Sequence, residues 1–189
     1  MSDRIKILGT EVLHQSKYTL KNVTYTEGDE DKKLTREVYD RGDAAAILLY
    51  NKEAKTVVLT KQFRLPSFLN GNPQGVLIEA CAGMLDEDDA EACARREAEE
   101  ETGYRVQAVQ HAFDAYTSPG AVTEVIHCFV AEYTPGMKVS KGGGLALEGE
   151  AIELLEPTLN AALHMITTGE IKDAKTIMLL QYAKLQNLA

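Results

Sequence analysis

A stretch of helix-forming residues in the middle of the chain carries three glutamates that a helix would place on one face. Residues 90–102 read AEACARREAEEET, and Gly103 follows, a residue suited to the left-handed position just after a helix. On a helix, Glu97 lies three residues before Glu100 and four before Glu101, so the three carboxylates are neighbours. The alanines and the cysteine of the same segment favour close packing against a sheet. The pattern therefore predicts a helix that packs on a sheet and gathers like charges.

Such a cluster of carboxylates requires compensation. Like charges repel, and negative charge near a helix C-terminus opposes the helix dipole. Arg95 and Arg96 are expected to supply part of the compensating charge, and a hard cation such as Mg²⁺, which prefers carboxylate oxygens, would supply the rest. The alternative is an acidic helix face in solvent. The alanine-rich packing pattern and the flanking Gly83 and Gly103 favour the metal site.

The order of the remaining elements indicates the fold class. Alternating or apolar runs predict strands, and helix formers with capping residues predict helices. Residues 66–75, rich in Pro, Asn and Gly, are expected to form a loop. Strands are expected at 18–25, 34–42, 44–50, 56–64, 76–83, 105–116, 124–133 and 152–156, and helices at 90–102, 157–168 and 174–185. This order predicts an α/β or α+β sandwich in which helices cover a mixed sheet.

Length and charge restrict the possible partners. A chain of 189 residues can bury a core without disulfides, and its net charge of −9 argues against nucleic-acid binding through the general field. An anionic substrate would need local neutralisation by a divalent cation or by placed Arg and Lys residues. We expect no nucleic-acid or membrane partner.

Cysteine and histidine spacing exclude other chemistries. The number of cysteines is odd and none form a CxxC pair, which favours buried, reduced thiols at Cys81, Cys93 and Cys128. The four histidines lack HxxxH or HExxH spacing, so no zinc site is predicted. The N-terminus lacks the pattern of a signal peptide, and no segment has the apolar length of a membrane span, so a cytoplasmic protein is expected.

The glutamate segment resembles a known motif. REAEEETGY at residues 96–104 is similar to the second half of the Nudix box, in which R-E-U-x-E-E-x-G-U has apolar residues at U. The first half departs from the pattern: Gly83 lies one residue too close to Arg96, and Asp88 or Asp89 stands where a glutamate belongs. We interpret this as a shortened loop before the helix.

The resemblance extends over nearly the whole chain from Tyr18 onward. The segments REVYDRG, TVVLTKQFR, SPGAVTEVIHCFVAEY and TGEIKDAKT are similar to the branch of the Nudix superfamily that contains ADP-ribose and GDP-mannose pyrophosphatases, and to the bacterial GDP-mannose subgroup in particular. The resemblance implies a Nudix α/β/α sandwich at 43–189, a small N-terminal β domain at 1–42 for dimerisation and substrate contacts, and a homodimer with shared active sites.

The same resemblance implies an activity. The expected reaction is Mg²⁺-dependent hydrolysis of the pyrophosphate of a nucleoside diphosphate sugar, most closely GDP-mannose to GMP and mannose 1-phosphate. More than one ion is expected, and Mn²⁺ is a possible substitute. Two alternatives stay open: an ADP-ribose pyrophosphatase, and a non-catalytic Nudix module that binds a nucleotide.

The resemblance also suggests which residues hold the metal. The expected ligands are three carboxylates, of which the middle one binds directly or through water, and one backbone carbonyl: Glu97, Glu100, Glu101 and Ala82. Arg96 is expected to pair with a box glutamate and to orient it.

Further residues are expected to act on the substrate. Glu148 and Glu150 follow the glycine run 142–144 and are the candidates for the general base, because such loops carry the base or a further metal ligand in similar enzymes; an ordinary acidic loop is the alternative. Arg64 is expected to bind phosphate, with a salt bridge at the rim as its alternative. Lys175 is expected to contact the substrate across the dimer, although a surface lysine at a helix start would also fit.

Overall fold

The computed structural model describes residues 4–28, 32–85, 89–144 and 151–189. The chain forms two compact units. One contains residues 1–43 and 116–125, and the other contains residues 44–115 and 126–189. The first unit thus includes a later stretch of the chain that lies outside the expected N-terminal segment 1–42.

The first unit is built on a three-stranded antiparallel sheet in the order β1-β2-β3. Its strands are β1 (Ile5–Gln15), β2 (Thr19–Glu27) and β3 (Leu34–Asp40). Residues 116–125 join β3, because Tyr39 N donates to Ala121 O at 2.7 Å and Thr123 N donates to Tyr39 O at 3.1 Å. Every residue of β1 is exposed, including five large apolar side chains.

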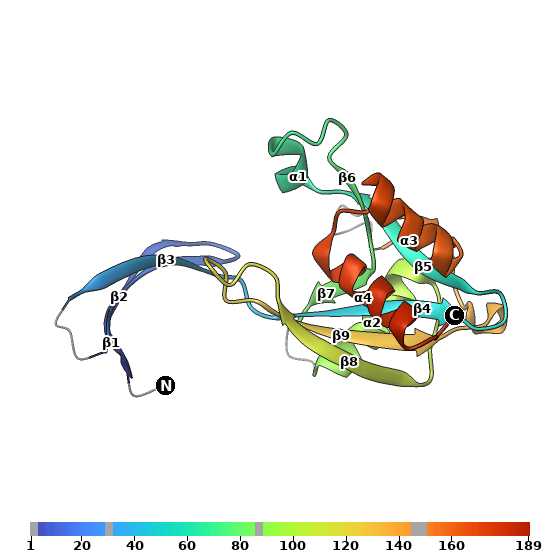
Figure 1. The fold of residues 1–189 in the computed structure, drawn as a ribbon, viewed down its shortest axis with the longest axis horizontal. Coiled ribbons are helices and arrows are strands. Elements are labelled where there is room, and N and C mark those ends of the chain that lie inside the picture. Colours follow the sequence, from blue (N-terminus) through green and yellow to red (C-terminus); the bar gives the residue numbers. More distant parts are fainter. Residues whose placement is uncertain (1–3, 29–31, 86–88, 145–150) are drawn as a thin grey trace. The chain divides into compact units, whose positions relative to one another are not determined.

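The second unit contains a seven-stranded mixed sheet. Its main path runs β10-β5-β4-β9-β8, while β6 pairs with β5 and β7 pairs with β4 (Figure 1). The strand bounds are β4 (Ala44–Asn51), β5 (Thr56–Phe63), β6 (Val76–Glu79), β7 (Cys81–Met84), β8 (Val109–Tyr116), β9 (Val125–Glu132) and β10 (Glu153–Leu155). β4 runs antiparallel to β5 and parallel to β9, so it is the central strand of a mixed sheet.

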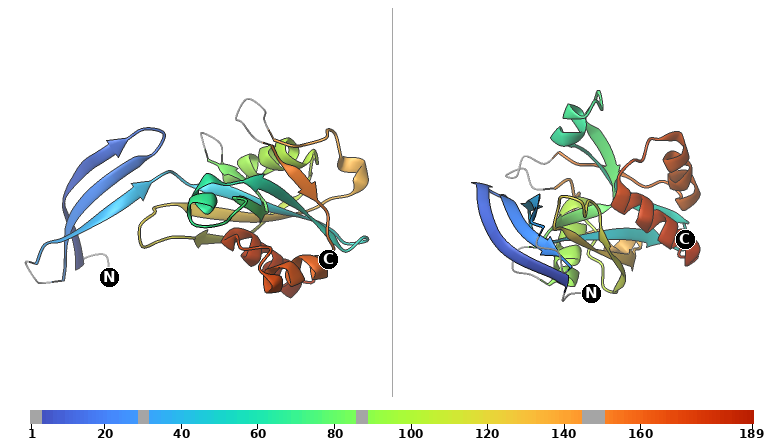
Figure 2. Two further views of the ribbon diagram at one scale, coloured as in Figure 1. Left: turned by 90° about the horizontal axis from the view of Figure 1, so that it is seen from above. Right: turned by 60° about the vertical axis from the view of Figure 1, so that its left-hand side comes forward.

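Helices cover both faces of this sheet, as Figure 2 shows. α2 (Ala90–Thr102) lies on one face, and α3 (Leu159–Thr168) and α4 (Ala174–Leu185) lie on the other. β4 alternates between them: Ala45, Ile47 and Leu49 belong to the core beside α2, whereas Ala46 and Leu48 belong to the core beside α3 and α4. The expected α/β/α sandwich is therefore confirmed.

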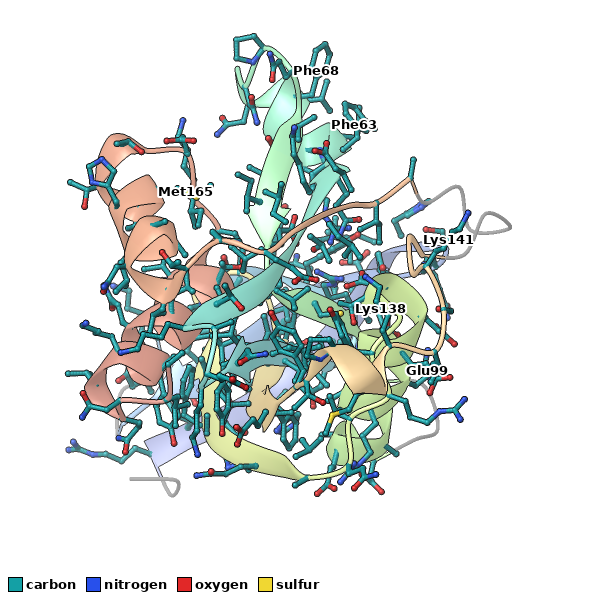
Figure 3. All side chains as sticks on the ribbon, turned by 90° about the vertical axis from the view of Figure 1, so that its right-hand side faces the viewer. Phe63, Phe68, Glu99, Lys138, Lys141 and Met165 are labelled. Atoms are coloured by element: carbon teal, nitrogen blue, oxygen red, sulfur yellow. The ribbon has the colours of Figure 1, made fainter. Side chains whose placement is uncertain are left out.

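Two local expectations were wrong. Residues 65–69 form a short helix, α1 (Leu65–Leu69), inside the expected loop, with proline near its first position, where its missing N–H costs no hydrogen bond. Phe63 and Phe68 lie with their ring centroids 6.1 Å apart beside this helix (Figure 3). The expected single strand 76–83 is two strands, because the chain changes its partner from β5 to β4 at Ala80.

Within the described residues, the helices are all too short or too polar to cross a bilayer.

Candidate active site

The helix α2 is held at both ends by local contacts. The Asp89 side chain accepts a hydrogen bond from Ala92 N and caps the helix start. Gly103 adopts a φ of 77° at the helix end, as its position predicted. The glycine run then returns to the last turn, because Gly143 N donates to Glu101 O at 2.8 Å. These bonds satisfy helix carbonyls that would otherwise lack partners.

Glu97 and Glu101 of α2 lie on the side that packs against β7. Glu101 is 2% exposed, and Glu97 is also largely buried. The Cys81 thiol donates to the backbone carbonyl of Glu97 at 3.2 Å. Burial raises the pKa of this thiol well above its usual value, and the negative charges of Glu101 and Glu97 add to the effect. The helix therefore presents these two carboxylates to β7 instead of to solvent.

Gly83 explains how the Glu97 carboxylate comes so close to the backbone of β7. A Cβ atom at this position would overlap the carboxylate and Cγ of Glu97. The side chain thus lies directly over the strand, one residue from Ala82. Carboxylates beside a backbone segment that can offer a carbonyl form an all-oxygen donor set, which suits Mg²⁺ and disfavours a soft ion.

The two arginines of α2 have different partners. Arg96 Nη1 donates to Glu97 Oε1 at 2.8 Å and lies 3.6 Å from Glu100 Oε2. Arg95 instead pairs with Glu91 at 2.6 Å and donates to the carbonyl of Gln107 at 2.6 Å. Of the two arginines expected to compensate the cluster, only Arg96 therefore pairs with its glutamates.

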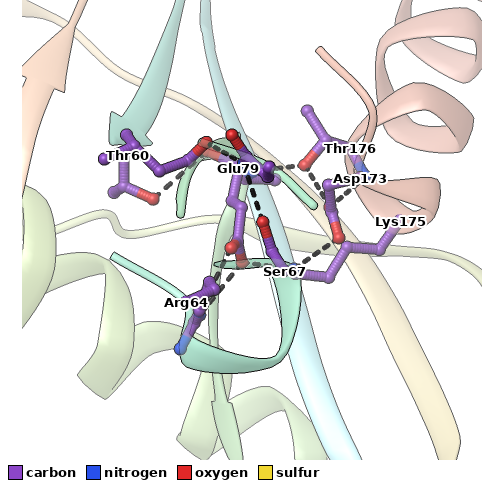
Figure 4. A network of polar contacts seen from close by, with 10 residues as sticks. Thr60, Arg64, Ser67, Glu79, Asp173, Lys175 and Thr176 are labelled. Atoms are coloured by element: carbon purple, nitrogen blue, oxygen red, sulfur yellow. Dashed lines mark hydrogen bonds and ion pairs between the residues drawn. The ribbon is translucent and has the colours of Figure 1, made fainter. Parts of the chain in front are cut away.

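A buried carboxylate that the sequence analysis did not select joins the two expected substrate-binding cations. Glu79, at the end of β6, accepts from Arg64 Nε at 2.8 Å and Nη2 at 3.0 Å, and from Lys175 Nζ at 2.7 Å (Figure 4). Its side chain is 3% exposed. Burial raises the pKa of Glu79, but the hydrogen bonds and charges of Arg64 and Lys175 outweigh this and bring it to about 2. The carboxylate is therefore ionised at neutral pH.

The position of Lys175 at the start of α4 is stabilised by two carboxylates. Its ammonium group also lies 3.1 Å from Asp173 Oδ1, and Asp173 caps the helix by accepting from Thr176 N. Thr176 Oγ1 accepts in turn from Ala80 N at 2.6 Å, which fixes the helix start to the junction of β6 and β7. Burial lowers the pKa of Lys175, but the nearby carboxylates of Glu79 and Asp173 raise it by more. The net shift of the Lys175 pKa is therefore upward.

The glutamate cluster and the Glu79 network are close enough to interact. The pKa of Arg64 is raised chiefly by its hydrogen bonds with Glu79, and the charges of Glu101 and Asp173 contribute. Arg64 binds Glu79 through one edge of its guanidinium and keeps 40% of its side chain exposed. The structure thus brings Glu101 of α2, Arg64 at the start of α1 and Lys175 of α4 into one region of the second unit.

Two expected residues cannot be placed. Glu148 and Glu150 lie outside the described residues. Glu79 could have been found in the sequence as the lone charge in the apolar run VLIEACAG, because a charge in a buried strand requires a partner.

Comparison with known sequences gives a consistent picture. Residues 40–178 match the NUDIX domain family. A GDP-mannose pyrophosphatase of Cronobacter sakazakii is 49% identical over 191 residues, covering 100% of this chain and 99% of the relative. A GDP-mannose pyrophosphatase of Citrobacter koseri is 52% identical over 185 residues, covering 96% of each chain.

Comparison with solved structures supports the fold. The crystal structure of an ADP compounds hydrolase superimposes with a TM-score of 0.77 and covers 97% of this chain and 94% of its own. Its sequence identity is 16%, so this likeness concerns the architecture alone.

Proposed function

The chain belongs to the NUDIX domain family, and from this premise we propose that it hydrolyses the pyrophosphate of GDP-mannose to GMP and mannose 1-phosphate. The full-length similarity to GDP-mannose pyrophosphatases supports the substrate. The observation that carries the chemistry is the packing of Glu97 and Glu101 against β7, with the charge of Glu101 acting on Arg64.

The acidic cluster is the proposed site of Mg²⁺. Glu97, Glu100 and Glu101 and the Ala82 carbonyl would hold more than one ion, and Mn²⁺ could replace it. When bound, the metal neutralises charge on the diphosphate and favours ionisation of the attacking water. Arg96 holds Glu97 in place through its 2.8 Å hydrogen bond.

The reaction moves one water molecule across a phosphoanhydride. The water oxygen forms a bond to one phosphorus, the bond from that phosphorus to the bridging oxygen breaks, and the bridging oxygen leaves with the other phosphate. Glu150 or Glu148 accepts the proton from water. Support for their role comes from the described residues on either side of them in the chain. Gly144 N donates to Glu100 O in the last turn of α2, and Ile152 N donates to Gly143 O.

Two cations are proposed to bind the substrate. Arg64 would contact a phosphate with the exposed part of its guanidinium, because an Arg fork suits phosphate oxygens. Lys175 would contact the substrate beside it. Glu79 is a positioning residue in this proposal: it holds both cations and keeps them charged.

The first unit is proposed to form the homodimer. A cavity of about 530 Å³ lies within this unit, and its apolar lining includes Ile5, Ile7, Val23, Tyr25 and Val38. Apolar side chains on an exposed strand are expected to be covered by a partner, and a second copy of the chain would do so.

Ile7→Asp should shift the sedimentation coefficient from dimer to monomer. A wild-type monomer at micromolar concentration would contradict the dimer.

A side-by-side assay tests the substrate. With Mg²⁺ present, a phosphomonoesterase releases phosphate from the products of GDP-mannose and ADP-ribose hydrolysis, and we expect the larger kcat/KM with GDP-mannose. A large preference for ADP-ribose would contradict the proposed substrate. Absence of turnover with either compound, together with a ligand-induced rise in Tm, would indicate a binding module. All three cysteines are buried, and such buried thiols support a location in the reducing cytoplasm.

A further inference from the structure

Two histidines and an aspartate meet on the second unit, away from the glutamate cluster. Asp114 Oδ1 lies 2.7 Å from His111 Nε2 and 2.8 Å from His127 Nδ1. One ligand atom from each residue lies within 4.8 Å of the others. His111 and Asp114 belong to β8 and His127 to the neighbouring β9. The three side chains are accessible to solvent ions, since two are exposed and His127 is partly buried.

An interruption of the strand alternation brings these groups together. Residues three apart in a regular strand point to opposite faces. In β8, however, Ala112 and Phe113 both pack against the core beside α3 and α4, so His111 and Asp114 share the other face. The His111 ring is held edge-on against Phe129, with centroids 5.4 Å apart. The ligand atoms are therefore directed toward one another by packing.

The donor set differs from that of the α2 glutamates. Two imidazole nitrogens and one carboxylate oxygen suit Zn²⁺, which takes three such protein ligands and a water in tetrahedral geometry. Hydrogen bonds from both imidazoles lower the pKa of Asp114, so its carboxylate is available as an anion. Tetrahedral Zn²⁺ bonds of about 2.0 Å separate ligand atoms by about 3.3 Å, so each imidazole nitrogen would move away from the Asp114 oxygen by about half an ångström.

The cluster lies on the same face of the sheet as Glu97, but two strands away from it. His127 pairs with Ala45 of β4, and Ala45 pairs on its other side with Gly83, which lies under Glu97. Two strand spacings amount to about 10 Å, so one ion cannot occupy both places.

We propose that His111, Asp114 and His127 form a second metal site that binds a Zn²⁺-like transition-metal ion and fastens the edge strand β8 to β9. The bound ion replaces the two imidazole–carboxylate hydrogen bonds with coordination bonds between the strands. Because the ion binds the folded arrangement, it stabilises this edge of the sheet by mass action.

Zinc titration in excess Mg²⁺ tests the proposal. The full-length protein is stripped with a chelator, supplied with millimolar Mg²⁺ to occupy carboxylate sites, and titrated with Zn²⁺ against a chromophoric chelator. We expect one Zn²⁺ per chain, with affinity at least about tenfold lower in His127→Gln and Asp114→Asn. His164→Gln, which removes an exposed histidine of α3, should bind as the wild type does.

Two further measurements locate the ion. ¹⁵N NMR should show zinc-dependent shifts at Nε2 of His111 and Nδ1 of His127, and Zn²⁺ should raise the Tm of the wild type more than that of His127→Gln. Equal Zn²⁺ affinity in wild type and His127→Gln would overturn the proposal. Loss of Zn²⁺ binding in Glu101→Gln with unmoved histidine resonances would also overturn it, because the ion would then occupy the glutamates.

Discussion

The ammonium of Lys175 lies 2.7 Å from the carboxylate of Glu79, and both side chains are almost fully withdrawn from water, with 10% and 3% exposure. The same carboxylate binds Arg64 on its other side. One buried anion at the end of β6 thus sets the positions of two cations from separate elements. Lys175 belongs to α4, and Arg64 precedes α1. Several expected outcomes depend on this arrangement and on the glutamate face of α2.

Replacing Glu79 with Gln should both lower the free energy of unfolding and weaken substrate binding. The substitution leaves the Lys175 charge buried with Asp173 as its nearest anion, and breaking a buried pair costs about 3–5 kcal/mol. Urea unfolding measures the stability. Steady-state kinetics with GDP-mannose should show a KM increase of about tenfold or more, because Arg64 and Lys175 lose their common anchor.

Glu99→Gln is the matched control for this substitution. Glu99 pairs with Arg105 at the surface of α2, where solvent screens the pair, so its loss should change stability little and leave KM unchanged. A KM for Glu79→Gln equal to that of the wild type would remove the positioning role and leave a purely structural ion pair.

The contribution of Glu79 to stability should depend on acid pH. Its pKa is 4.5 in its ordinary state and about 2 in the folded protein. A lowered folded-state pKa means that its stabilisation is complete above pH 4.5 and is lost as the pH falls toward 2, by about 3 kcal/mol in total. The difference in unfolding free energy between wild type and Glu79→Gln should therefore shrink between pH 6 and pH 3. A constant difference would show that Glu79 is not ionised in the folded protein.

Glu101→Gln should abolish turnover while the fold is retained. The change preserves the shape of the side chain but removes the charge that we propose binds Mg²⁺, so kcat is expected to fall by about two to four orders of magnitude. Circular dichroism and Tm would show that α2 is intact, and Glu99→Gln, with its exposed carboxylate, should keep wild-type turnover. Near-wild-type turnover of Glu101→Gln would refute its assignment.

Gly83→Ala should displace Glu97 and so raise the Mg²⁺ concentration needed for half-maximal activity. The added methyl group would occupy the space of the Glu97 carboxylate, which must then rotate away from β7. Gly136→Ala is the control, because the nearest atom to its added Cβ is 4.0 Å away. If Gly83→Ala has the Mg²⁺ dependence of the wild type, Glu97 does not hold the ion beside β7.

The sequence predicted the local elements well where their patterns were strong. Residues 90–102 are helix formers between a capping aspartate and a glycine, and both ends of α2 were predicted within a residue or two. The apolar strands 44–50 and 56–64 and their turn likewise predicted the hairpin of β4 and β5. The close approach of Glu97 to Gly83 and the strand break at Ala80 depend on partners far away in the chain, so local patterns could not reveal them.

By itself the sequence determined the acidic face of α2 and the sandwich class, because helix and strand periodicities place side chains on known faces without any long-range contact. Tertiary structure alone decided that Glu79 joins Arg64 to Lys175, and that His111, Asp114 and His127 converge. These groups are separated along the chain or by a break in the strand alternation. Their meeting depends on which strands pair and how β8 is packed, which residue spacing does not encode.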